Sequence, residues 1–115
     1  MANKPRALKR RHLVYYLEVY DDAANELLGH LVDLTTTGFK LVSKQRIPTN
    51  RNYRLRMMLP AGYFSQKDFY FEAKSLWSAN DINPDFYDTG FATSKLELKT
   101  QNIIRDLVDR ISFND

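Results

Sequence analysis

The sequence predicts a mainly β protein, a small six-stranded antiparallel β-barrel with one C-terminal α-helix. Three observations support this prediction. Apolar and polar residues alternate with period two in short stretches between residues 12 and 98, which is typical of strands with one buried face. Turn-forming residues separate these stretches at regular intervals, as in small barrels. After residue 98 the apolar residues change to helical spacing.

One domain is expected, because 115 residues with 43% hydrophobic content suffice for a single hydrophobic core. The chain divides into a basic arm over residues 1–11, a barrel over 12–98 and a helix over 99–113. The arm contains Pro5 and has little apolar surface to bury, so we expect it to be flexible.

The first three strands are expected over residues 12–20, 26–34 and 39–44. In the first strand, the residues on one face are Leu13, Tyr15, Leu17 and Val19. In the second strand, strict alternation places Asp33 on the same face as Leu31, opposite the face that carries His30. The spacing of these two strands fits a hairpin.

The other three strands are expected over residues 53–59, 69–77 and 91–98. Alternation places Trp77 on the core-facing side of the fifth strand, together with Phe69, Phe71, Ala73 and Ser75. Residues 80–90 are rich in Asn, Asp and Pro and are predicted to form a loop. Thr100 is the predicted N-cap of the helix. The apolar face of that helix carries Ile103, Ile104, Leu107, Val108 and Ile111.

The composition argues against several functional classes. The chain has no cysteine, so disulfides, cysteine-based zinc sites and thiol nucleophiles are excluded. His12 and His30 lie far apart, and the acids of residues 80–90 are interpreted as turn residues, so we predict no metal site. Common enzyme motifs are missing from the sequence, which predicts a noncatalytic protein. No apolar run reaches about 20 residues, so we expect a soluble cytoplasmic protein without membrane contact.

Basic residues are concentrated at the N-terminus. Residues 1–11 hold no acid and five bases, namely Lys4, Arg6, Lys9, Arg10 and Arg11. The whole chain has 17 Lys and Arg against 14 Asp and Glu, a net charge of +3. Without the arm, 12 bases face 14 acids and the net charge is −2. The arm is therefore predicted to bind an anion beside a nearly neutral domain.

Two short motifs stand out next to the predicted first hairpin. Arg6 and Arg10 form R-x-x-x-R just before the first strand. Asp33, Thr35 and Gly38 form D-x-T-x-x-G at the end of the second strand. Because the start of a strand lies beside the end of its antiparallel partner, we expect both motifs at one rim of the barrel.

These residue types suit a guanine nucleotide. An arginine guanidinium offers a planar fork of donors to phosphate oxygens or to guanine O6 and N7. The carboxylate of Asp33 can accept from guanine N1–H and the exocyclic amine, and the hydroxyl of Thr35 can reach phosphate or base. Gly38 permits a positive φ or a close approach of the backbone to a ligand.

With these motifs the chain resembles the PilZ domain family, the bacterial receptor modules for cyclic di-GMP. The family pattern is R-x-x-x-R before the first strand and D/N-x-S-x-x-G between the second and third, and here Thr35 replaces the usual Ser. The likeness extends over essentially the whole chain, including the strand of Trp77, the Gly90-Phe91 segment and the terminal helix.

The resemblance implies a binding site for cyclic di-GMP, with no other cofactor. The candidate ligand-binding residues are Arg6, Arg10, Arg11, Asp33, Thr35, Gly38 and Trp77. For Trp77, the predicted position on the core face favours packing over stacking on the ligand. Ligand binding is expected to order the arm, because charge-assisted hydrogen bonds offset the entropy lost.

The resemblance also implies a signalling role, in which the ordered arm is read by a separate output protein. In the family such modules regulate motility, adhesion, exopolysaccharide or virulence. Two alternatives remain open. One is a nucleic-acid-binding barrel of the oligonucleotide-binding type, which the net charge of −2 outside the arm disfavours. The other is a PilZ-like interaction module without ligand affinity, which the intact arginine pair and Asp33 disfavour.

Overall fold

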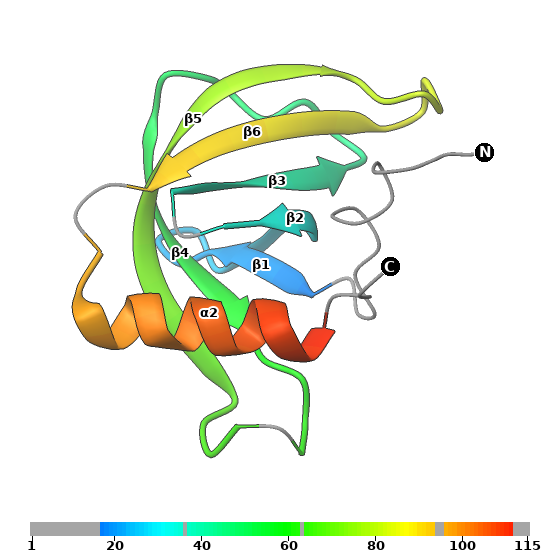
Figure 1. The fold of residues 1–115 in the computed structure, drawn as a ribbon. Coiled ribbons are helices and arrows are strands. Elements are labelled where there is room, and N and C mark those ends of the chain that lie inside the picture. Colours follow the sequence, from blue (N-terminus) through cyan, green and yellow to red (C-terminus); the bar gives the residue numbers. More distant parts are fainter. Residues whose placement is uncertain (1–16, 36, 63, 94–95, 112–115) are drawn as a thin grey trace.

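The computed structural model describes residues 17–35, 37–62, 64–93 and 96–111. These residues form β1 (Glu18–Asp21), β2 (Glu26–Leu34), β3 (Gly38–Ser43), β4 (Asn52–Met58), β5 (Asp68–Asn80), β6 (Tyr87–Thr93) and α2 (Leu98–Ile111). The six strands close into an antiparallel barrel in the order β1-β2-β3-β6-β5-β4, and α2 lies across one side of it (Figure 1). The predicted fold class is confirmed. The predicted arm over 1–11 lies outside the described residues.

The alternation of apolar residues predicts the first strands well. β2 has the predicted bounds, and β3 and β4 each differ from the prediction by one residue at both ends. β1 ends at Asp21, one residue beyond the prediction, and the part of the predicted first strand before residue 17 lies outside the described residues. The fully buried inward side chains of these four strands are Val19, Leu31, Leu41, Leu55 and Met57.

The predicted sixth strand is present, but its predicted bounds are wrong. β6 begins at Tyr87 rather than at residue 91, and β5 reaches Asn80, so the loop between them is shorter than predicted. Polar residues that are common in loops take part in this hairpin as paired strand residues. The hydroxyls of Ser78 and Thr89, both buried, lie 2.9 Å apart and satisfy each other.

The helix is found where its spacing predicts, but its start differs. α2 begins at Leu98, so Thr100 lies inside the first turn and is not the N-cap. The backbone N–H of Gln101 already donates to the Glu97 carbonyl at 2.9 Å. The helix residues that are fully buried against the barrel are Ile104 and Leu107. Among the described residues, no helix has the length and apolar character that crossing a bilayer requires.

Aromatic side chains support the start of β3 from inside the barrel. The ring of Phe39 stacks on that of Phe91, with centroids 4.8 Å apart, and meets the edge of Phe71 at 5.4 Å. Such ring pairs add stability beyond the area that they bury. Because Phe39 follows Gly38 directly, this cluster holds the β2–β3 turn on a rigid base.

Candidate functional site

The β2–β3 turn is closed by its own threonine. The hydroxyl oxygen of Thr35 accepts from the backbone N–H of Thr37 at 3.3 Å and of Gly38 at 3.2 Å. The same hydroxyl donates to the Gly38 carbonyl at 3.1 Å, and the Thr35 N–H donates to that carbonyl at 2.8 Å. The Thr37 hydroxyl also lies 3.2 Å from the Thr35 hydroxyl. A hydroxyl has one donor and two acceptor positions, so contacts within the turn fill those of Thr35. Thr35 therefore shapes the turn, and its predicted contact with a ligand stays a prediction.

Gly38 is required by a neighbouring strand. Its φ is not in the left-handed region, so of the two reasons considered for a glycine here, the positive φ does not apply. A Cβ at this position would lie 2.7 Å from the carbonyl oxygen of Phe91 on β6. The carbonyl oxygen belongs to the β6 backbone and can move only with the strand. Only glycine therefore fits without a shift of β3 or β6.

Replacing Gly38 with alanine is expected to destabilise the barrel by about 1–3 kcal/mol, the usual cost of overpacking. The midpoint of urea unfolding would measure this loss. Thr37→Ala is the matched control in the same turn, because it leaves the backbone unchanged and removes an exposed hydroxyl that contacts the Thr35 hydroxyl at 3.2 Å. Its effect should stay within about 0.5 kcal/mol. Equal midpoints for Gly38→Ala and wild type would contradict the steric role of Gly38.

Asp33 lies on the outer wall of the barrel, although strict alternation places it on the same face as Leu31, which is buried. The register of β2 against β3 shifts between Leu31 and Asp33, which marks a β-bulge. Because a bulge adds one residue to one strand, Leu31 and Leu34 are both buried while Asp33 is half-buried and pairs with Lys40. The carboxylate is thereby directed away from the core.

Trp77 is moved outward by a second bulge, and its predicted core position is wrong. The register of β5 against β6 shifts between Ser75 and Trp77. Ser75 and Ser78 are buried, whereas Leu76 and Trp77 are both exposed, with 46% of Trp77 accessible. The indole lies against Gly90 on β6, where any Cβ would overlap the ring. Gly90 thus leaves room for a flat, accessible aromatic surface.

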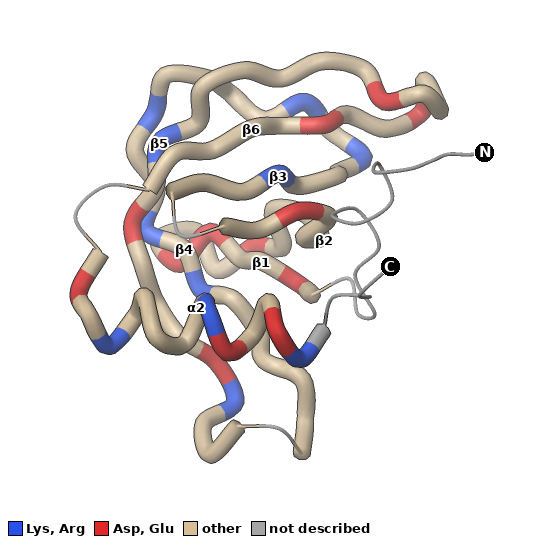
Figure 2. The backbone as a smooth tube through the Cα atoms, viewed as in Figure 1, with Lys and Arg blue, Asp and Glu red and all other residues tan. Residues whose placement is uncertain are grey.

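The two bulges bring Asp33 and Trp77 into one row across four strands. Asp33 pairs with Lys40, Lys40 with Gly90, and Gly90 with Trp77. Directly paired residues of antiparallel strands point to the same face. We call Asp33, Lys40, Gly90 and Trp77 the outer row. At about 4.8 Å between neighbouring strands, its ends are roughly 14 Å apart. Figure 2 shows the basic position of β3 between acidic positions of β2 and β6.

Sequence reasoning missed Lys40 as a member of the site. Lys40 stands two residues after Gly38 on an alternating strand, and nothing in its own segment distinguishes it from any surface lysine. Its position depends on the register with β2 and β6, which local composition does not reveal.

The arginines of the first motif, Arg6, Arg10 and Arg11, lie outside the described residues. Of the expected approach between the two motifs, the structure confirms the antiparallel β1–β2 pairing. Leu17, the first described residue, accepts a hydrogen bond from the backbone N–H of Leu31 at 2.8 Å, two positions before Asp33. The contact of the arginine pair with the turn stays a prediction.

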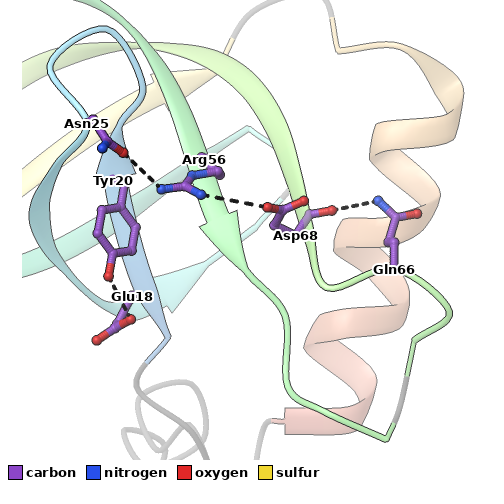
Figure 3. Close-up of polar contacts among 6 residues, drawn as sticks. All are labelled: Glu18, Tyr20, Asn25, Arg56, Gln66 and Asp68. Carbon is purple, nitrogen blue, oxygen red and sulfur yellow. Dashed lines mark hydrogen bonds and ion pairs between the residues drawn. The ribbon is translucent and has the colours of Figure 1, made fainter.

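The arginines of β4 are occupied by neighbouring side chains. The guanidinium carbon of Arg56 lies 4.8 Å from the ring centroid of Tyr20, and its nitrogens reach Asp68 at 3.9 Å and Asn25 at 3.4 Å (Figure 3). Arg54 is exposed and lies within 4 Å of the carboxylates of Asp22 and Glu72. Because carboxylates neutralise both arginines, this wall of β1, β4 and β5 is a poor surface for a polyanion.

Asp88 on β6 lies close to the outer row. The pKa of this carboxyl is raised, mainly by burial. A hydrogen bond with Asp81 and the negative charge of Asp81 raise it further. The charge of Lys40 acts in the opposite direction. Lys40 and Asp88 are diagonal neighbours on one face, because Lys40 pairs with Gly90 two positions along β6.

Replacing Asp88 with asparagine is expected to stabilise the protein at pH 7. A carboxyl with a raised folded-state pKa favours folding below its unfolded-state pKa of about 3.9, and this contribution is lost as the pH rises through the folded-state pKa. The gain at pH 7 should be about 0.2–0.5 kcal/mol, because solvent screens this largely accessible carboxyl, and it should fade near pH 4. Urea midpoints at the two pH values measure it. The same gain from Asp85→Asn, in the same hairpin, would indicate a general charge effect instead.

A pocket of about 800 Å³ lies at the other end of β2 from the turn. Acidic side chains, including Glu26, and basic ones, including Lys44 and Arg46, line it together. Arg46 also donates to the Ser78 carbonyl at 2.9 Å. The lining contains no residue of the outer row, so the candidate site is a surface on the barrel wall, separate from this cavity.

Comparison with known proteins supports the fold. No model of a known protein family matches the sequence, and no curated protein matches it. Among solved structures, the Inhibitor of motility (MotI/DgrA) of Bacillus subtilis is similar, with a TM-score of 0.66 and 15% identity. The similarity covers 94% of this chain and 52% of that one, so this chain spans about half the length of the similar protein. At this identity the likeness shows the fold alone, a PilZ-like barrel.

Proposed function

We propose that this chain is a noncatalytic receptor for cyclic di-GMP. The observation that carries the proposal is the outer row beside the β2–β3 turn, in which Asp33 and an exposed Trp77 face the same side of the barrel. The two side chains offer different contacts to a purine. A carboxylate accepts from the donor edge of guanine, and an indole stacks on its face. A ligand with two guanines can use both contacts at once.

The arm supplies the positive charge in this proposal. Arg6 and Arg10 bind phosphate oxygens or guanine edges through their forks of donors. The barrel without the arm has a net charge of −2, so phosphates would find little attraction there without these arginines. Ordering the arm over the ligand creates a new surface, which we propose is read by an output protein. The name of the similar protein, an inhibitor of motility, makes a motility component one such partner to test.

Calorimetric titration of the full chain with cyclic di-GMP tests the proposal, with GTP and short single-stranded DNA as controls. Trp77 is the single tryptophan, so intrinsic fluorescence reports directly on the outer row. We expect saturable binding of cyclic di-GMP with a change in tryptophan emission, and much weaker binding of GTP and DNA. Equal or tighter binding of DNA would favour the nucleic-acid alternative. Absence of binding to every ligand would favour an interaction module without ligand affinity.

A further inference from the structure

Lys40 occupies a distinctive electrostatic position in the outer row. It lies half-buried on the outer wall, directly opposite Asp33 and diagonal to Asp88. Among the described residues, no carboxylate oxygen lies within 4.0 Å of its ammonium group and no side-chain hydrogen bond involves it. Arg54 and Arg56 on the opposite wall, by contrast, are held by carboxylates. Within the described part of the chain, no hydrogen bond or ion pair occupies the three donors of Lys40.

In a cyclic dinucleotide, phosphates join the two riboses that carry the bases, so a ligand with its two bases at the two ends of the outer row brings its ribose–phosphate ring over the middle of that row. In the outer row, Lys40 stands between the carboxylate that suits a guanine edge and the indole that suits a guanine face. Asp33 and Asp88 would repel a phosphate at this point. The ammonium group of Lys40 is the cation of the outer row, stands between these two carboxylates, and can bind phosphate as a compact point charge.

We propose that Lys40 binds a phosphate of the cyclic dinucleotide from the barrel wall itself. The inference rests on the proposed function and adds a residue to its site. A cyclic dinucleotide has two phosphates. Lys40 takes one of them, and the arginines of the arm remain for the other or for guanine edges. Lys40 thus adds one phosphate contact from the barrel wall to those proposed for the arginines.

Three variants test this role by calorimetry with cyclic di-GMP. Lys40→Met keeps the apolar stem and removes the charge. Lys40→Arg keeps the charge. Lys74→Met is the matched control, because Lys74 is exposed on the same outer wall and pairs with Ala92, in the row next to Lys40. Melting temperatures of the free variants show whether each one folds as wild type does.

We expect Lys40→Met to weaken binding about tenfold to a hundredfold, the range for loss of a charge-assisted hydrogen bond. The affinity of Lys40→Arg for cyclic di-GMP should stay within about threefold of wild type, and that of Lys74→Met within about twofold. Phosphorus NMR of the ligand at saturation adds a readout that a merely structural role would not move. One of the two bound phosphorus resonances should return towards its free position in Lys40→Met and stay shifted in Lys40→Arg.

The outcomes separate the two proposals. If wild type does not bind cyclic di-GMP, the proposed function fails and the role of Lys40 fails with it. If wild type binds and Lys40→Met binds equally well, or loses no more than Lys74→Met, only the role of Lys40 is overturned. Unchanged phosphorus resonances in Lys40→Met would overturn it as well, even with weaker affinity, because the lost energy would then not come from a phosphate contact.

Discussion

Replacing Arg6 or Arg10 with alanine is expected to weaken cyclic di-GMP binding about tenfold to a hundredfold. Each arginine of the R-x-x-x-R motif supplies a charge-assisted contact that neutral residues of the barrel cannot replace. The barrel without the arm has a net charge of −2, so long-range attraction does not compensate for the loss. Calorimetric titration of each variant measures the effect, and the melting temperature of the free protein should not change.

Lys4→Ala is the matched control for the arginine variants. It removes the same charge from the same arm but lies outside the motif. Its effect should be within about threefold, as for a screened surface charge. If Lys4→Ala cost as much as Arg10→Ala, binding would depend on the total charge of the arm and the R-x-x-x-R assignment would be wrong. A lowered melting temperature in Arg6→Ala or Arg10→Ala would instead assign the arm a structural role.

Replacing Asp33 with alanine should also weaken cyclic di-GMP binding by about tenfold or more, because the donor edge of guanine loses its acceptor. The sign of this effect is informative. Asp33 is an acid, so a site that recognised phosphate alone would bind equally well or better after the replacement. Calorimetry with cyclic di-GMP and cyclic di-AMP measures both affinity and base preference, since adenine lacks the N1–H donor.

We expect Asp33→Ala to reduce the preference for guanine over adenine as well as the affinity. Asp85→Ala, which removes a carboxylate from the β5–β6 loop outside the outer row, should change neither quantity appreciably. Tighter binding of both dinucleotides by Asp33→Ala would contradict the proposed contact between Asp33 and guanine and would indicate a general anion site.

Local sequence patterns account for most of the fold. Alternation at residues such as Val19, Leu41 and Leu55 specifies strands with one buried side. These apolar side chains stabilise the folded state only when they are removed from water. Helical spacing at Ile104 and Leu107 likewise predicts the closing helix. The bounds of the sixth strand were mispredicted because polar residues such as Thr89 satisfy one another across the hairpin, which composition does not reveal.

For the candidate site too, some features follow from the sequence and others only from the tertiary structure. The sequence by itself determined the charge of the arm, the two motifs and their order along the chain, since these are properties of residue type and spacing. Only the tertiary structure decided that Asp33 and Trp77 face outward on one row with Lys40 between them. A bulge is a difference in residue count between two paired strands, and alternation within one strand cannot report it. The faces of both residues therefore depend on partners distant in the sequence, and so does the site that they form.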